Sequence, residues 1–183
     1  MRELSKQSHG VAIGPDAVRF ERVLPGPIER VWAYLAESDK RAQWLAAGEI
    51  PPRVGAEAQL RFHHASLSPA KVPTPEPFKA MENGISSLHR VTRYEPPHAL
   101  GITWGDEDTP SQVLFELSAE GEQVRLVVTH TRLPSREKMV MTGGGWHTHL
   151  DILAERLAGN TPPPFWTAFL QMQEEYRKHF GPE

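Results

Sequence analysis

The sequence predicts an α+β fold in which an antiparallel sheet wraps around a long helix near the C-terminal end. Three observations support this. One short strand near the N-terminus leads directly into an amphipathic helix, the following segments up to residue 133 have the alternation of strands, and a long helix comes after them. Helices that stand at the two ends of a run of strands are typical of the α+β class, whereas the α/β class alternates them.

The first strand and helix are predicted by residues 18–44. Residues 18–24 form the strand, and a Pro-Gly-Pro corner begins the helix. Pro27 has its φ fixed near the helical value, and its missing N–H is not needed in a first turn. One apolar stripe follows at i, i+3, i+4 and i+7, made of Ile28, Val31, Trp32 and Leu35. A second short helix ends at Trp44, and residues 1–15 predict a loose lead-in or an edge segment.

Alternation of apolar and polar residues predicts the remaining strands. It marks residues 58–63, about 87–94, 99–104 and a hairpin over 112–133. In the second strand of the hairpin the alternation continues to His130, which therefore lies on the apolar face. Residues 65–84 are rich in proline and have no period. So long a connection is expected to be mobile or to act as a functional flap.

Two helices complete the chain. Residues 143–159 predict the long helix, and Gly159 is suited to end it. Glycines 143–145 stand at the N-terminal end of this predicted helix and indicate close helix–sheet packing or a hinge, since no phosphate-binding motif accompanies them. After the NTPPP break, an extra helix is predicted over about 163–180, with an apolar stripe that begins at Phe165. We expect a single domain over 1–183, with its core at about 18–159.

Composition limits the classes of function. The chain has 183 residues, of which 39% are hydrophobic and 23% charged, with a formal net charge of −3 and no cysteine. These values are typical of a soluble globular protein and give no general attraction to nucleic acid. No signal peptide or membrane-spanning run is present, so we expect a cytoplasmic protein that binds neither nucleic acid nor membrane. The absence of cysteine excludes disulfides and thiolate metal sites.

The order and spacing of several segments resemble one superfamily. The segments are the strand-to-helix stretch with Val31, Trp32 and Trp44, the sequence RYEPPHALGITW, the hairpin end VTHTRLP and the helix that starts with GGW. Together they resemble the SRPBCC superfamily, which includes START and birch-pollen-allergen-like proteins, and within it the branch of Aha-type heat-shock-ATPase activator homologues. The resemblance implies a helix-grip fold with an apolar cavity between sheet and helix. It implies little about chemistry, because fold does not fix function.

The predicted interior faces supply a set of candidate pocket residues. Aromatic and aliphatic side chains would form the walls, and three histidines would offer polar anchors or, for His130, a weak candidate for a general base. A histidine that only hydrogen-bonds inside the core is the more common case. The candidates are Phe62, His64, Trp104, Phe115, His130, Met139, Trp146, His149, Leu150 and Leu153. The histidine spacings do not match a metal site, so neither a metal nor another cofactor is expected.

Three functions follow as hypotheses. The first is binding of a small apolar or amphipathic molecule in the cavity, for transport, sensing or sequestration. The second is a cofactor-independent enzyme of the cyclase or hydratase kind, with His130 as acid–base group. The third is a chaperone-interacting role like that of the heat-shock-ATPase activators, although the chain lacks their separate N-terminal domain. A homodimer through the stripe of the last helix is also open.

Overall fold

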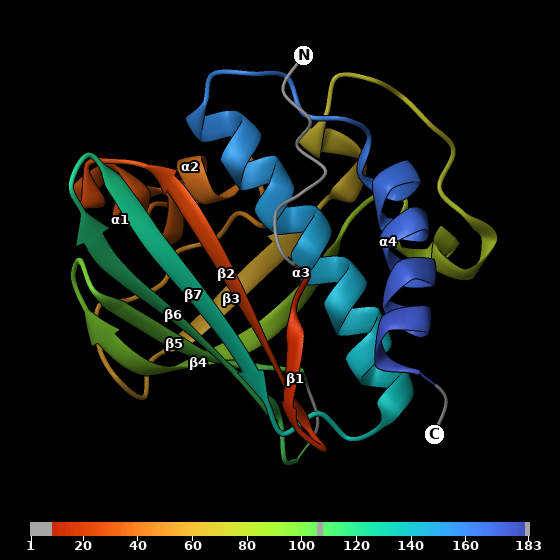
Figure 1. Ribbon diagram of the computed structural model, residues 1–183, viewed down its shortest axis with the longest axis horizontal. Coiled ribbons are helices and arrows are strands. Elements are labelled where there is room, and N and C mark those ends of the chain that lie inside the picture. The colour runs from red at the N-terminus through yellow and green to blue at the C-terminus, as the bar shows by residue number, and fades with distance from the viewer. Residues whose placement is uncertain (1–8, 106–107, 182–183) are drawn as a thin grey trace.

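The computed structural model describes residues 9–105 and 108–181, which form the predicted α+β helix-grip fold (Figure 1). Its seven strands make one antiparallel sheet in the order β1-β2-β7-β6-β5-β4-β3. The strands are β1 (Val11–Gly14), β2 (Ala17–Pro25), β3 (Glu57–Phe62), β4 (Ile85–Glu95), β5 (Ala99–Trp104), β6 (Ser111–Glu120) and β7 (Gln123–Thr131). The helices are α1 (Ile28–Ala36), α2 (Ser38–Arg41), α3 (Arg136–Leu157) and α4 (Phe165–Phe180), with short 3₁₀ turns η2 (His64–Leu67) and η3 (Glu76–Met81).

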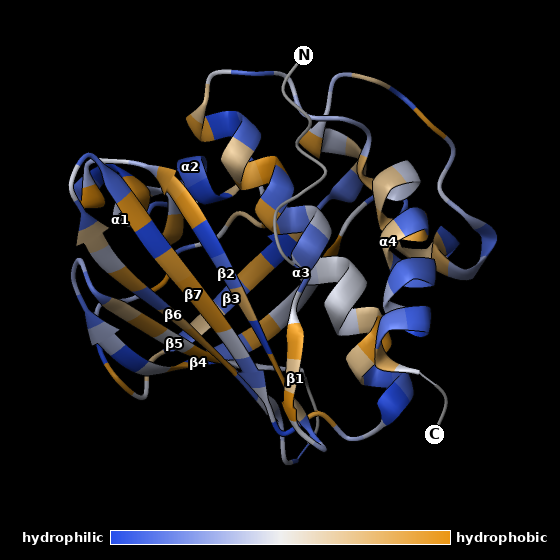
Figure 2. Cartoon of the chain, in the orientation of Figure 1, coloured by the Kyte–Doolittle hydropathy of each residue, from blue (hydrophilic) through white to orange (hydrophobic). Residues whose placement is uncertain are grey.

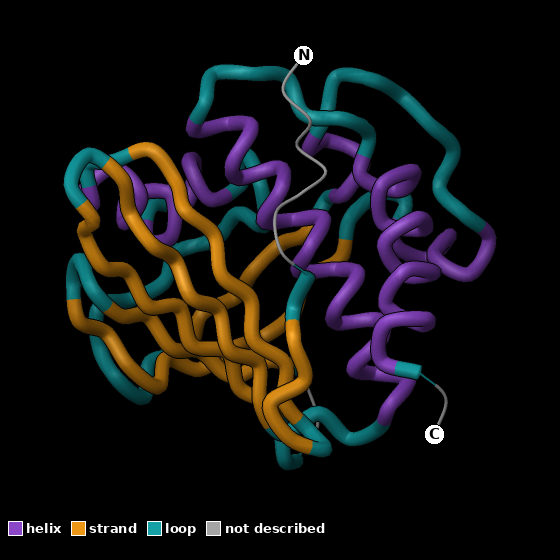
Figure 3. Tube along the Cα trace, viewed as in Figure 1, coloured by secondary structure: helices purple, strands orange, loops and turns teal. Residues whose placement is uncertain are grey.

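The alternation in the strands decides which face of the sheet holds the core. Figure 2 shows hydrophobic and hydrophilic residues alternating along the strands. In β3 the even-numbered residues from Ala58 to Phe62 are buried and their neighbours are exposed. The same period in β7 buries Val124, Leu126, Val128 and His130, so the predicted interior position of His130 is confirmed. The sheet curves around α3, which runs across its apolar face (Figure 3).

The start of the long helix differs from the sequence prediction. Helix α3 begins at Arg136, seven residues before the expected start at 143, because Ser135 caps it. The Ser135 hydroxyl accepts a hydrogen bond from the backbone N–H of Lys138 at 3.2 Å. The three glycines therefore lie inside the helix, and the prediction that they stand at its N-terminal end was wrong. Glycine usually disfavours a helix interior, so these positions need another explanation.

Helix α4 supplies that explanation, because it packs closely on Gly143 and Gly144, where the sequence had predicted packing against the sheet. A Cβ added at Gly143 would lie 2.7 Å from the ring of Tyr176, and one added at Gly144 would lie 3.0 Å from the backbone nitrogen of Gln173. Only a residue without a side chain permits this approach. The apolar stripe of α4 is consequently buried against its own chain, at Phe165, Phe169, Tyr176 and Phe180. A homodimer, which stays a prediction, would need another surface.

The long connection between β3 and β4 is packed against the helices. Its second 3₁₀ turn, η3, carries Phe78. The Phe78 ring stacks on Trp166 at a centroid distance of 4.9 Å and meets Phe169 edge-on at 5.4 Å. Of residues 1–15, expected to be a lead-in or an edge segment, residues 1–8 lie outside the described residues, and Val11–Gly14 form β1, the edge strand beside β2. The long connection is therefore held by contacts with α4, and β1 is held by its pairing with β2.

We predict that Gly143→Ala destabilises the protein, because the added methyl group would collide with the anchored Tyr176 ring. The expected loss in free energy of unfolding is about 1–3 kcal/mol, as for other overpacked sites. The matched control is Gly145→Ala, where an added Cβ meets nothing within 4 Å. There the better helix propensity of alanine should stabilise the protein by about 0.5–1 kcal/mol. Urea unfolding of both variants tests this, and equal effects of the two substitutions would contradict it.

Candidate ligand-binding cavity

A cavity of about 380 Å³ lies between the apolar face of the sheet, α3, the first turns of α4 and the segment with η2 and η3. This volume falls in the range of sites that bind small organic molecules. Its walls are mainly aromatic and aliphatic, and they also carry four histidines. The lining residues include Leu45, Phe62, His64, Phe78, Met81, His89, Trp104, Ser111, His130, Lys138, Trp146, His149, Phe165, Trp166 and Phe169.

Six of the ten sequence candidates border this cavity, namely Phe62, His64, Trp104, His130, Trp146 and His149. The other four, Phe115, Met139, Leu150 and Leu153, are buried in the core and do not line it. They lie on faces that point to the interior, but neighbouring side chains cover them. Phe115, for example, packs edge-on against Trp146 at a centroid distance of 5.5 Å. Parity along an element thus separates inside from outside, but does not separate the cavity wall from the packed core.

Several lining residues were missed by sequence reasoning. The aromatic group at the start of α4 was recognised as a stripe, but its partner surface was not. His89 gave a usable signal, since it is two residues from the apolar Val91, which is buried on the same face of β4. Phe78 gave no signal of this kind, because residues 65–84 show no regular alternation of apolar and polar residues.

His130 is the middle member of a chain of hydrogen bonds that runs from the Trp146 indole to the Trp104 carbonyl. The Trp146 indole N–H donates to its Nδ1 at 3.0 Å, and its Nε2 is 2.7 Å from the Ser111 hydroxyl. An indole nitrogen can only donate, so Nδ1 is the acceptor and the ring proton sits on Nε2. Ser111 passes the chain on to the Trp104 carbonyl at 2.9 Å. Burial lowers the pKa of His130 to about 4, and both ring nitrogens are already engaged.

His149 has one nitrogen engaged. Its Nδ1 is 2.7 Å from the backbone carbonyl of Trp44, which can only accept, so Nδ1 carries the proton. Burial lowers the pKa of His149 to about 4, although the bond to Trp44 opposes this shift. The ring is therefore neutral at pH 7, and its Nε2 carries a lone pair. Across the cavity wall, His89 is fixed by the Thr103 carbonyl at 2.8 Å and the Ser87 hydroxyl at 2.7 Å.

His64 is buried without the support that the other histidines have. Its Nδ1 is enclosed and has no hydrogen-bond partner among the described residues. Burial lowers its pKa to about 3, and the neighbouring His149 and His63 add to this shift. The four cavity histidines thus differ, because His130 and His89 are satisfied by protein groups whereas His64 and His149 keep unused capacity.

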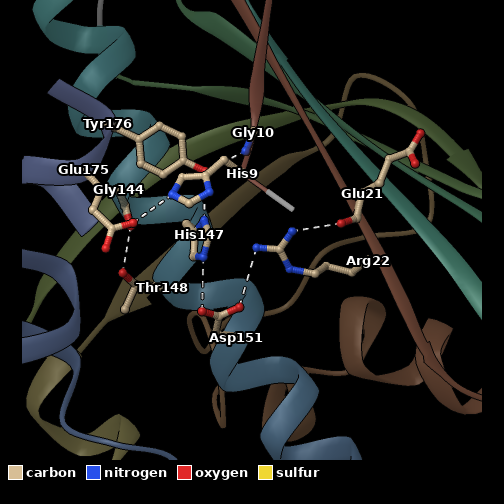
Figure 4. Close-up of polar contacts among 10 residues, drawn as sticks. All are labelled: His9, Gly10, Glu21, Arg22, Gly144, His147, Thr148, Asp151, Glu175 and Tyr176. Atoms are coloured by element: carbon tan, nitrogen blue, oxygen red, sulfur yellow. Dashed lines mark hydrogen bonds and ion pairs between the residues drawn. The ribbon is translucent and has the colours of Figure 1, made fainter. Parts of the chain in front are cut away.

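A second polar network holds the α4 wall in place on the far side of α3 (Figure 4). The Tyr176 hydroxyl accepts from the Gly10 backbone N–H at 2.6 Å and lies 2.8 Å from Nδ1 of His147. The other nitrogen of His147 faces Asp151 at 3.4 Å, and Asp151 in turn faces the buried Arg22 at 3.5 Å. Burial raises the pKa of Tyr176 to about 12, so the phenol stays neutral. This network joins β2, α3 and α4.

The described residues 9–105 and 108–181 contain no group of three histidine, aspartate or glutamate side chains that could hold a metal ion. Within the same ranges, none of the helices combines the length and the apolar character that crossing a membrane requires.

The fold defines a protein of the helix-grip class. The model of the family described as "Activator of Hsp90 ATPase homolog 1-like protein" matches residues 25–158. The chain belongs to this family, which confirms the resemblance seen in the sequence. No curated protein matches the chain.

Solved structures show the same fold. The solution structure of the protein encoded by gene BPP1335 of Bordetella parapertussis is 50% identical, with a TM-score of 0.80, over 93% of this chain and 89% of that one. CalU16 from Micromonospora echinospora is 21% identical, with a TM-score of 0.63, over 91% and 89%. DynU16, from the dynemicin biosynthetic locus, is 22% identical, with a TM-score of 0.63, over 81% of this chain and 49% of its own. At such identity the last two are evidence for the fold alone.

We predict that the buried neutral histidines make the protein less stable in acid. The folded-state pKa values of about 3 for His64 and about 4 for His130 and His149 lie below the ordinary 6.5. Below pH 6.5 the unfolded chain takes up protons that the folded chain does not, so this stabilisation is complete above that pH and is lost as the pH falls toward 4. The free energy of unfolding in urea should be lower at pH 5 than at pH 7 by about 2–5 kcal/mol.

The matched variants for this measurement are His64→Phe and His63→Phe. His63 is exposed, whereas His64 is buried. His64→Phe should weaken the pH dependence by about 1–2 kcal/mol over the same interval, and His63→Phe should leave it unchanged. Equal stability of the wild-type protein at both pH values would contradict the assignment of neutral buried histidines.

Proposed function

We propose that this protein binds a small apolar or amphipathic molecule in the cavity between the sheet, α3 and α4. The observation that carries the proposal is the cavity itself, about 380 Å³ in volume, beside the hydrophobic core. Protein interiors seldom keep such space without use, since each lost contact lowers stability. Transport, sensing or sequestration of the ligand would all use this site. The cysteine-free sequence suits such a role in the reducing cytoplasm.

The nature of the walls supports an apolar body for the ligand. Phe62, Trp104, Trp146, Phe165 and Trp166 all border the cavity. Aromatic rings contribute large apolar areas and favour flat partners that stack or meet edge-on. Among the described residues, Lys138 is the only lysine or arginine in the wall, and it is solvent-exposed in the first turn of α3. An amphipathic ligand would place its apolar part inside and any charged part toward this lysine.

The two alternatives gain no comparable support. General-base catalysis by His130 needs a lone pair, and the Trp146 indole occupies the one on Nδ1. Activation of a chaperone ATPase is named in the description of the family, but nothing on the described surface of this chain points to a chaperone partner. We therefore propose ligand binding alone.

A cavity-filling variant tests the proposal. Gly145 lines the cavity, and a Cβ there meets nothing within 4 Å. Gly145→Leu should therefore fold, with a better helix former in α3, while its side chain takes up space in the cavity. Titration with the uncharged fluorescent probe N-phenyl-1-naphthylamine should show one saturable site in the wild-type protein, and Gly145→Leu should weaken it by at least about tenfold.

The control for this experiment is Gly145→Ala, which adds only one methyl group and should keep most of the binding. Native mass spectrometry of the wild-type protein, followed by denaturation, gives a second readout by releasing any molecule that co-purifies. If Gly145→Leu binds the probe as well as the wild-type protein does, the probe is outside the cavity and the proposed site is wrong.

A further inference from the structure

Two histidines at one end of the cavity have hydrogen-bonding capacity that the protein does not use. His149 keeps the Nε2 lone pair, because its proton is on the Nδ1 that donates to the Trp44 carbonyl. No described residue hydrogen-bonds to that Nε2. His64 is only 6% exposed, and its enclosed Nδ1 has no hydrogen-bond partner among the described residues. A buried polar group without a partner is destabilising, so its presence in a cavity wall points to a ligand.

The two rings are close enough to share one ligand atom. Their centroids are 5.6 Å apart. Two hydrogen bonds of about 2.8 Å each span up to about 5.6 Å, which matches the separation of the ring centroids, so one oxygen between the rings can serve both when a nitrogen of each ring faces it. His149 can only accept a hydrogen bond at this position. His64, whose tautomer no protein group fixes, can donate one. The group that satisfies both is one that donates and accepts at the same atom, as a hydroxyl does.

The surroundings of the pair favour an uncharged group on an aromatic ring. Phe165 packs against both histidines, with ring centroids at 4.5 Å from His64 and 4.7 Å from His149. Trp166 lies 5.0 Å from His64. The pair is therefore enclosed by aromatic rings, and burial keeps both imidazoles neutral. A carboxylate or phosphate would meet the lone pair of His149 and find no positive charge to compensate its own desolvation.

We propose that the cavity selects a flat aromatic molecule with a free hydroxyl group, which donates to Nε2 of His149 and accepts from His64. This inference rests on the proposed function, because it assigns a polar specificity to the same cavity. It places the hydroxyl at the end beside α4, where Phe165 packs on both histidines. The satisfied histidines then shape the wall, and the unsatisfied pair recognises the ligand.

A series of probes with the same ring system tests the proposal in the wild-type protein. The probes are 2-naphthol, 2-methoxynaphthalene, naphthalene and 2-naphthoate, at pH 7. Binding is followed by the indole N–H signals of the cavity tryptophans in ¹⁵N-labelled protein. We expect 2-naphthol to bind at least about tenfold more tightly than naphthalene and 2-methoxynaphthalene, which cannot donate a hydrogen bond. The anionic 2-naphthoate should bind more weakly than 2-naphthol.

A matched pair of variants assigns the preference to the histidines. His64→Phe removes no hydrogen bond within the protein, so it should raise the Tm of the unliganded protein by about 2–4 °C. It should also reduce the preference for 2-naphthol over naphthalene to within about threefold, because one of the two hydrogen bonds is lost. His63→Phe makes the same change at an exposed neighbour outside the cavity, and it should alter neither quantity.

The outcomes separate this inference from the proposed function. Equal binding of 2-naphthol, 2-methoxynaphthalene and naphthalene would keep the cavity as an apolar site and overturn the hydroxyl specificity. Tightest binding of 2-naphthoate would overturn it as well, in favour of an anionic ligand. If none of the four probes moves an indole signal, the cavity does not bind aromatic molecules, and the proposed function fails together with the inference. Should His64→Phe not fold, the wild-type series still decides.

Discussion

The close contact between α3 and α4 at the glycines is the constraint on which the rest of the structure depends. Gly143 and Gly144 let α4 approach so closely that a methyl group at Gly143 would lie 2.7 Å from the Tyr176 ring. From this contact α4 carries Phe165, Trp166 and Phe169 to the open side of the sheet, where they complete the cavity wall. The same wall receives Phe78 from the long connection between β3 and β4. A wider separation of the helices would leave the cavity open to solvent on that side.

Tyr176 secures the contact in two ways. Its ring fills the groove at Gly143, and its hydroxyl connects Gly10 and His147, from which the network continues to Asp151 and the buried Arg22. Because buried polar groups are costly unless they are satisfied, this network favours one arrangement of β2, α3 and α4 over near alternatives. The polar groups on this side of α3 therefore have a structural role. On the cavity side, by contrast, His64 and His149 retain hydrogen-bonding capacity that no described protein group uses.

Much of the fold could be predicted from local pattern. The parity of β7 placed His130 correctly on the interior face, and the apolar stripe placed Trp146 and His149 on the inner side of α3. Prediction failed at the start of α3, since glycines weaken a helix locally and the gain from packing against α4 is not visible in the neighbouring residues. It also could not separate Phe115 and Leu150, which are covered by neighbours, from Phe62 and Trp104, which border the cavity.

The sequence by itself determined the order of the strands and helices, their inner faces and the family, because periods of two and 3.6 residues are properties of short segments. It also determined the absence of thiol chemistry. Only the tertiary structure decided that α4 forms a cavity wall, that His130 is a satisfied histidine and that His64 lacks a partner. These facts depend on residues distant in the chain, such as His130 and Trp146 or His149 and Trp44. A hydrogen bond has a direction and a length of about 3 Å, and only the folded chain fixes both.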